Sequence, residues 1–333
     1  MEPELIAVLA VIAVALVFDY TNGFHDAANA IATSISTRAL TPRVALAMAA
    51  IGNFIGAHFG AGVAKTVGSG LVDLPTGVSS LGIVFAGVIG AITWNLITWY
   101  FGLPSSSSHA LIGGLVGSTL AASHTVLWGG IGRDVVLPMI LSPLVGFILG
   151  YIVMIAVQWI FRNGQPAKLN RGFRWAQTAS AAAMSIGHGM QDAAKTIGIV
   201  VLALFVGGYQ NSAEHIPEWA FWTSATVLAL GTYAGGWRII RTLGRKIIDL
   251  RPPEGFAAES VASAVLYFNA LVLHAPISTT HTITSAIMGV GATKRLSAVR
   301  WGVAGNIVGA WILTFPAAGS IGAIMYFLVN PLF

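Results

Sequence analysis

The stretch that decides the fold is Gly23-Phe24-His25-Asp26-Ala27-Ala28-Asn29, because a similar stretch occurs a second time. It returns loosely as Gly189-Met190-Gln191-Asp192-Ala193-Ala194-Lys195, at an offset of 192 − 26 = 166 residues. A second pair of segments has nearly the same offset, 276 − 104 = 172: Pro104-Ser105-Ser106-Ser107-Ser108-His109 returns as Pro276-Ile277-Ser278-Thr279-Thr280-His281. Two matches in the same order predict a chain built from two similar halves.

The composition places both halves in a membrane. The 333 residues are 56% hydrophobic and 9% charged, whereas an average soluble domain is about 25% charged. We expect ten apolar segments that cross ~30 Å of hydrocarbon, the first of each half being interrupted. They lie near 4–36, 44–64, 79–101, 107–123 and 135–161, and near 176–207, 219–240, 259–275, 279–293 and 300–329.

The start of the chain and its cysteine content limit the class of protein further. Residues 1–18 have no basic start and no clear cleavage site, so we expect a retained first helix. Cysteine is absent, which excludes disulfides and thiolate metal sites. The net charge of +5 is not accompanied by basic residues interleaved with aromatics in a soluble segment, so no nucleic-acid partner is expected.

Basic residues fall on one side of the predicted membrane. They gather at Arg38 and Arg43, in the 162–174 segment, in the 238–251 segment and in the 294–300 segment. The positive-inside rule makes that side cytoplasmic and both termini extracytoplasmic. The opposite loops hold the acidic residues Glu2, Glu4, Asp73, Glu214 and Glu218, with Lys65 and Arg133 as basic exceptions.

An odd number of crossings in each half makes the two halves run through the membrane in opposite directions. The predicted fold is therefore an all-α polytopic membrane protein with two inverted repeats of about five segments each, interrupted helices and a hairpin pair in each half. The first repeat is 1–161, a basic cytoplasmic linker is 162–175, and the second repeat is 176–333. Inverted repeats are typical of secondary transporters, whose sites lie near the midplane.

The two aspartates are the first candidate site. An ionised carboxylate inside the bilayer costs at least ~2.5 kcal/mol, so Asp26 and Asp192 should face a partner, an ion or water. They could bind a coupling cation or take up a proton. Asn29 lies on the same helical face as Asp26. The plainer interpretation makes Asp26 a cap of a helix that restarts at Ala27.

Three other polar residues accompany the aspartates. His25 and Gln191 directly precede them, and a titrating His25 could move protons, although a histidine bonded to backbone at a helix break is equally compatible. Lys195 has two open interpretations: a structural ion pair with an Asp, or positive charge at an anion site.

The hydroxyl-rich segments carry the clearest anion signal. Each follows a proline at the place where a helix would begin, and helix N-termini attract oxyanions. The candidate ligands of a tetrahedral anion are Ser105, Ser106, Ser107, Ser108, Ser278, Thr279 and Thr280. The plainer interpretation is that they only cap the helices. We expect His109 and His281 to be packed polar residues. No carboxylate that could orient these histidines lies nearby in the sequence, so we do not expect a Ser-His hydrolase site.

These motifs resemble one family. The sequence is similar to the inorganic phosphate transporter (PiT) family, most of all to bacterial low-affinity phosphate permeases. Six matching segments, spread over essentially the whole chain, are GFHDAANA (23–30), LPSSSSHAL (103–111), GGWRIIR (235–241), GFAAE (255–259), ISTTHTIT (277–284) and RWGVAGN (300–306).

The resemblance implies a phosphate symporter of the cytoplasmic membrane with its site between two hairpin tips, at 104–109 and 276–281. It places cation coupling on Asp26, Asn29 and Asp192, and Lys195 matches a lysine that the family usually carries. His25 resembles the proton-coupled branch, which also carries phosphate with a divalent metal, whereas sodium-coupled relatives more often have Asn there. Gln191 departs from the usual Asn.

Some questions stay open at the level of the sequence. The coupling cation is H⁺ or Na⁺, the oxyanion is phosphate or sulfate, and a homodimer is one alternative for the assembly. We expect no cofactor, no fixed structural metal site and no enzymatic activity. An anion channel would need a continuous polar pore, and an intramembrane enzyme would need a nucleophile, a base and an orienting group.

Overall fold

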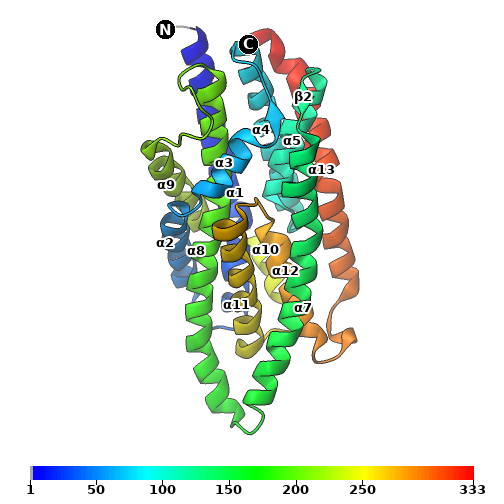
Figure 1. The fold of residues 1–333 in the computed structure, drawn as a ribbon. Helices are drawn as coiled ribbons and strands as arrows, with labels where there is room; N and C mark the ends of the chain where they lie inside the picture. Colours follow the sequence, from blue (N-terminus) through cyan, green and yellow to red (C-terminus); the bar gives the residue numbers. More distant parts are fainter. Residues whose placement is uncertain (1–2) are drawn as a thin grey trace.

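The computed structural model describes residues 3–333, and almost all of them lie in helices (Figure 1). Met1 and the predicted extracytoplasmic Glu2 lie outside the described residues. Both ends of the described chain lie at the same end of the molecule, which is called the terminal end below (Figure 1). The turn between the two halves lies at the other end.

The first half contains seven α-helices and two very short strands. The helices are α1 (Pro3–Ser36), α2 (Pro42–Ala57), α3 (Ala61–Ser69), α4 (Val78–Phe101), α5 (Ser107–Ala121), α6 (Trp128–Gly130) and α7 (Leu137–Ile160), and the π-helical turn η1 (Ile131–Val136) joins the last two. Strands β1 (Val72–Asp73) and β2 (Thr125–Val126) pair antiparallel, with Val72 opposite Val126.

The second half repeats this order without strands among the described residues. Its helices are α8 (Pro166–Val206), α9 (Glu218–Ala234), α10 (Trp237–Arg241), α11 (Pro252–Phe268), α12 (Thr279–Ala292) and α13 (Trp301–Val329). Shorter π or 3-10 segments are η2 (Thr242–Lys246), η3 (Asn269–Leu273), η4 (Leu296–Ala298) and η5 (Asn330–Leu332).

Fewer helices are long and apolar enough to cross a membrane than the ten segments expected. Six helical stretches of the described chain are long and apolar enough, or seven if the bent pair α2 and α3 counts as one span. Three of the expected segments that fail this test are the hairpin arms α5 and α12 and the 17-residue helix α9. Helix α5 has 15 residues and α12 has 14, so each is only about 22 Å long, less than the ~30 Å of a bilayer core.

The two hairpins enter the molecule from opposite ends. The α4–α5 hairpin opens at the terminal end, where Gly82 of α4 lies against Phe333. The α11–α12 hairpin opens at the other end, where Lys294 pairs with Glu254 at 2.6 Å (Figure 1). Their tips meet in the interior, since Ser108 Oγ donates to the carbonyl of Ile277 at 3.0 Å. This arrangement confirms the opposed hairpins that the inverted repeat predicted.

Helices α1 and α8 are continuous, which corrects the expected interruptions near Asp26 and Asp192. The glycines beside the aspartates let neighbouring helices approach and do not break the helix. A Cβ on Gly23 would lie 2.6 Å from the carbonyl oxygen of Leu228, and one on Gly189 would lie 2.4 Å from that of Asn53. Asp26 therefore does not cap a helix that restarts at Ala27.

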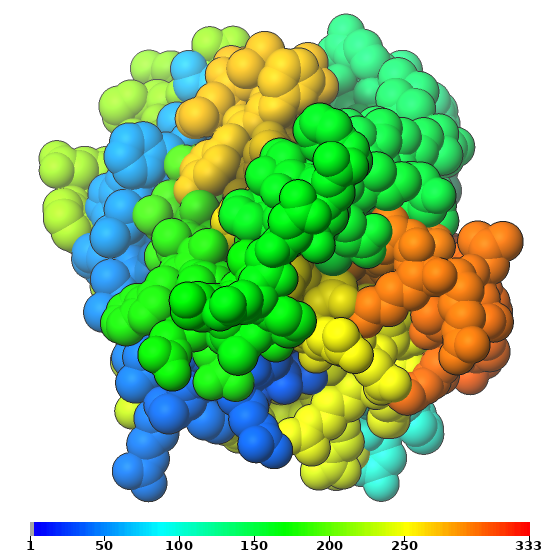
Figure 2. Space-filling view, turned by 90° about the horizontal axis from the view of Figure 1, so that it is seen from below, coloured from blue at the N-terminus to red at the C-terminus, as the bar shows by residue number. Residues whose placement is uncertain are grey.

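The segment expected as a linker, 162–175, is also mostly helical, because α8 begins at Pro166. With 41 residues α8 is about 62 Å long, so its first turns extend beyond the bilayer core. Exposed basic residues cover this end of the molecule, as Figure 2 shows for the segments that carry them. They are Arg38, Arg43, Arg162, Lys168, Arg171, Arg174, Arg245, Lys246, Arg251, Lys294, Arg295 and Arg300. These residues give this face its positive charge. Arg238, which the sequence analysis grouped with them, instead lies beside the tip of the α4–α5 hairpin, where its guanidinium donates to the carbonyl of Tyr100.

The halves are packed across each other. Helix α7 of the first half packs against α12, and α13 of the second half packs against α5. Helices α1 and α8 lie side by side at the centre, against α9, α4 and α11. The site residues of both halves are thereby brought to one place.

Candidate functional site

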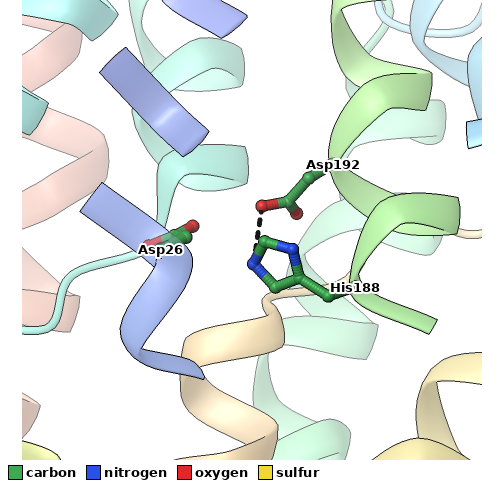
Figure 3. A group of neighbouring side chains, drawn as sticks. All are labelled: Asp26, His188 and Asp192. Atoms are coloured by element: carbon green, nitrogen blue, oxygen red, sulfur yellow. Dashed lines mark ion pairs between the residues drawn. The ribbon is translucent and has the colours of Figure 1, made fainter. Parts of the chain in front are cut away.

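Asp26 of α1 and Asp192 of α8 face each other in the middle of the molecule (Figure 3). Their exposed fractions are 1% and 0%. His188, one turn before Asp192 on α8, completes the group, with Nε2 lying 3.0 Å from Asp192 Oδ2. One ligand atom of each residue lies within 4.8 Å of the others, so two carboxylates and an imidazole are placed where a single cation could contact all three.

The hydrogen bonds around His188 show how its ring is oriented. Thr232 Oγ1 donates to the carbonyl of Leu228, so it accepts from Asn53 Nδ2 at 2.7 Å. Asn53 Oδ1 then accepts from His188 Nδ1 at 3.0 Å. A neutral His188 would consequently turn the lone pair of Nε2 toward a carboxylate. A second proton on the ring or a cation beside it removes that repulsion.

Lys195 and Ser107 connect the two carboxylates. Lys195 Nζ donates to Asp192 Oδ1 at 2.7 Å and to Ser107 Oγ at 3.0 Å, and its exposed fraction is 1%. Ser107 Oγ in turn donates to Asp26 Oδ2 at 2.8 Å. Lys195 therefore forms an ion pair with an aspartate, which was one of its two interpretations. Its ammonium also contacts Ser107, the first residue of α5.

The N-termini of α5 and α12 point at each other across this centre. Ser106 accepts from the backbone N–H of His109 at 3.2 Å, and Ser278 accepts from that of His281 at 3.1 Å. Both are thus helix caps, as the plainer interpretation of the hydroxyl clusters held. Each helix start still presents first-turn N–H groups and its partial positive charge to the centre.

The remaining hydroxyls divide into those that face the aspartates and those that do not. Asn29 Nδ2 donates to Thr279 at 3.1 Å and to Thr280 at 2.9 Å, and Thr280 Oγ1 lies 3.4 Å from Asp26 Oδ1. Ser107, Thr279 and Thr280 therefore line the centre. Ser108 instead ties the two hairpin tips together.

His25 and Gln191 each hold the hairpin of their own half. His25 Nδ1 lies 2.7 Å from Asp26 Oδ1, and Nε2 lies 3.0 Å from Thr98 Oγ1 and 3.4 Å from Ser105 Oγ. Gln191 bonds the backbone of the second loop, donating to Ala275 and accepting from Ile277 N, both at 3.2 Å. The side chain of Gln191 on α8 therefore contacts the hairpin loop and does not lie among the side chains around the carboxylates.

His109 and His281 are packed, as expected. Their rings lie 4.9 Å apart, and the His281 ring stacks on Trp311 at 4.0 Å. Among the described residues no ring nitrogen of either histidine has a hydrogen-bond partner. They fill the space behind the two helix starts.

The sequence analysis missed His188 and Asn22. Asn22 Nδ2 donates to Asp192 Oδ2 at 3.2 Å, so both residues contact the second aspartate. A signal for them was present: each lies four residues before an aspartate, and their offset of 188 − 22 = 166 equals that of the aspartates. The search stopped at the residues directly adjacent to Asp26 and Asp192.

The comparisons with known proteins agree with this architecture. The model of the phosphate transporter family matches residues 22–172 and again 162–322. The chain belongs to the phosphate transporter family. The double match covers both halves.

Two of three similar relatives span all or nearly all of the chain. The probable low-affinity inorganic phosphate transporter of Rhizobium meliloti is 49% identical over 97% of this chain and 96% of its own length. That of Bacillus subtilis is 44% identical over all of both chains. That of Streptomyces halstedii is 64% identical over 56% of this chain and 88% of its own.

One solved structure, of a sodium-dependent phosphate transporter, shares the fold. The TM-score is 0.88 at 23% identity, over 98% of this chain and all of the other. The family and the fold are therefore those that the repeated motifs indicated.

Proposed function

We propose that the protein is a secondary active symporter that moves inorganic phosphate across the cell membrane together with a cation. The observation that carries the proposal is that the donors best suited to an oxyanion are already bonded to the two aspartates. Ser107 and Lys195, which suit a tetrahedral oxyanion, are the groups that hold Asp26 and Asp192 in this structure. Relatives that span the whole chain bear the name of phosphate transporters.

The phosphate site would lie between the starts of α5 and α12. Ser107, Thr279 and Thr280 supply hydroxyl donors, Lys195 supplies positive charge, and the two opposed helix N-termini supply N–H groups. Ser106 and Ser278 would act by capping these helices, and Ser105 and Ser108 by fixing the tips.

Coupling follows from competition for these donors. A phosphate that takes the Ser107 hydroxyl and the Lys195 ammonium leaves both aspartates without their present partners. Two uncompensated buried carboxylates beside an anion are unfavourable, so a cation must enter the Asp26, Asp192 and His188 group. Binding of either ligand then favours binding of the other, as reciprocity requires.

We infer that the cation is a proton. His25 and Asp26 form a buried pair at 2.7 Å, and His188 faces Asp192 at 3.0 Å, so two imidazole–carboxylate pairs can take up protons. Sodium is the alternative. It is supported by the oxygen atoms of Asn29, Thr279 and Thr280 near Asp26, and by the name of the solved relative.

We propose the remaining properties on the same grounds. The basic face would be cytoplasmic and both termini extracytoplasmic. The cargo would be phosphate, alone or as a complex with a divalent metal. No residue is assigned a catalytic role, and no cofactor is required. The lipid bilayer is the main partner, and a homodimer stays an alternative for the assembly.

The test is uptake of labelled phosphate and labelled sulfate into proteoliposomes under separate proton and sodium gradients. We expect a proton gradient alone to drive concentrative phosphate uptake that an uncoupler abolishes. Stimulation by sodium alone would overturn the proton assignment, preferential sulfate uptake would overturn the oxyanion, and linear, non-saturating flux would indicate a channel.

A further inference from the structure

A line of buried polar residues follows one face of α1. The residues Asp19, Asn22, Asp26, Asn29 and Thr33 are spaced by three, four, three and four positions, which places them on one face of a helix. All five have exposed fractions of 0% or 1%. Asn22, Asp26 and Asn29 contact the site or lie within it, and Thr33 donates to Glu259 of α11. Asp19 lies seven residues, about 10.5 Å, from Asp26 toward the terminal end.

Asp19 is the last polar residue of this line. The next residues on the same face toward the terminal end are Ala15 and Val11, which are buried and apolar. A carboxyl group therefore sits at the boundary between the polar centre and an apolar layer. The mechanism proposed above does not use it.

The partners of Asp19 are too few for an ionised carboxylate. Oδ2 lies 2.6 Å from Ser224 Oγ of α9, and Oδ1 has no hydrogen-bond partner among the described residues. Thr196 Oγ1 is the second hydroxyl beside this carboxyl, but it makes no hydrogen bond of good geometry among the described residues, and neither does Asn22 Oδ1, one turn along the same face. An ionised carboxylate has about four acceptor sites, and leaving most of them empty inside a membrane costs several kcal/mol.

A neutral carboxylic acid satisfies the same geometry. Ser224 Oγ lies 3.3 Å from the carbonyl of Ala193, so its own hydrogen can go to that carbonyl. The protonated Asp19 can then donate to Ser224 Oγ at 2.6 Å, a length typical of a strong O–H···O bond. In this series of hydrogen bonds, Asp19 donates to Ser224 and Ser224 donates to the carbonyl of Ala193, so each hydroxyl hydrogen has an acceptor.

In residues 3–333, no free positive charge near Asp19 would compensate an ionised carboxylate in place of the proton. The charged groups near Asp19 are Asp192 and Lys195, both on α8, and they already form a pair at 2.7 Å. Helix α9 contributes only the Ser224 hydroxyl at this point.

We propose that Asp19 is a second proton-binding site of this transporter, separate from the Asp26, His188 and Asp192 group and occupied in the present conformation. Only the role of Asp19 in transport rests on the proposed symport. The binding itself is a property of the chain without phosphate. During the cycle, Asp19 would hold a proton between the terminal end and the central site.

The first test is infrared spectroscopy of the purified full-length protein in phosphate-free buffer near neutral pH. We expect the wild type to show the carbonyl stretch of a protonated carboxylic acid, and we expect D19N to lose one such band. D249N is the matched control, because the Asp249 side chain is 91% exposed and should contribute no protonated carboxyl. An unchanged band in D19N overturns the proposal.

S224A keeps the test valid if D19N fails to fold. This variant keeps the carboxyl group and removes its hydrogen-bond partner, so the band should shift in frequency. A band that S224A leaves in place would contradict the assignment to Asp19. Because no phosphate is present, this outcome is independent of whether the wild type transports phosphate.

The second measurement is the number of protons that enter proteoliposomes with each phosphate. We expect D19N to move one proton fewer than the wild type while its phosphate exchange under equal conditions on both sides is retained. An unchanged proton number would overturn a role in the cycle. A wild type that moves no phosphate would sink the proposed function and leave the infrared result standing.

Discussion

At the scale of single residues, the centre of the protein contains more carboxylate than its fixed positive charge can balance. Asp26 and Asp192 share one lysine, because Lys195 bonds Asp192 directly and reaches Asp26 only through Ser107. His25 and His188 stand beside the two carboxylates and can supply further positive charge only by taking up protons. In the proposed mechanism, this imbalance would couple the entry of an anion to that of a cation.

Replacing either aspartate should remove the coupling. We expect D26N and D192N each to abolish gradient-driven phosphate uptake, because an amide neither binds a cation as a carboxylate does nor takes up a proton. D249N, on the exposed surface, should retain uptake. The check is initial uptake rate in proteoliposomes at matched protein content. Normal concentrative uptake in both D26N and D192N would refute the placement of the cation.

Two adjacent serines should have different roles. S107A removes a hydroxyl that, in the proposed site, leaves Asp26 to donate to phosphate. A hydrogen bond to a charged group is worth about 1.5–3 kcal/mol, so KM for phosphate should rise by at least about tenfold. S106A removes a helix cap worth ~1 kcal/mol, so it should lower Tm and leave KM nearly unchanged. The opposite pattern of KM and Tm would show that the roles are exchanged.

The residues of the site were only partly predictable from the sequence. Asp26, Asp192 and Asn29 stand out because polar groups in an apolar run are costly. His188 shares the repeat offset and was overlooked. The hydroxyls of Ser106 and Ser108 could not be sorted from that of Ser107, because capping and substrate contact require the same residue type at adjacent positions.

At the scale of elements, the sequence predicted the two hairpins and the opposed helix starts, but not the straight course of α1 and α8. An interruption was expected where glycine and charged residues meet. The polar side chains instead find partners on the opposite long helix, as Asn22 does with Asp192. Such cross-helix pairs depend on which helices are neighbours, which residue spacing alone does not give.

The close approach of α1 and α9 can be tested at Gly23. A Cβ there would meet the backbone of Leu228 at 2.6 Å and of Thr232 at 2.8 Å, so G23A must push the helices apart at a cost of about 1–3 kcal/mol. G132A is the control, since a Cβ on Gly132 meets nothing within 4 Å. The measurement is Tm of the purified protein, and equal values for the two variants would contradict the contact.

At the scale of the whole molecule, the one-sided charge and the opposed hairpins support the proposed orientation. The segments that carry the exposed basic residues form the face seen in Figure 2, and both termini lie at the other end of the molecule (Figure 1). The positive-inside rule predicts that this basic face is cytoplasmic. The two hairpin tips meet between the faces, so movement of either hairpin would open the site toward a different side of the membrane.

Orientation can be measured directly because the chain has no cysteine. Single cysteines at exposed positions of the two faces, N163C beside the turn between α7 and α8 and S212C in the loop after α8, provide a matched pair. We expect a membrane-impermeant maleimide to label S212C in intact cells and to label N163C only after lysis. Labelling of N163C in intact cells would reverse the topology.

The central claim is that phosphate and a cation bind to one centre and move together. The most direct measurement imposes an inward phosphate gradient on proteoliposomes with no cation gradient and follows the internal pH and sodium concentration. We predict that phosphate drives protons inward, that the internal sodium concentration stays constant, and that D26N abolishes the proton movement. Phosphate that enters at the wild-type rate without moving any cation would contradict the account.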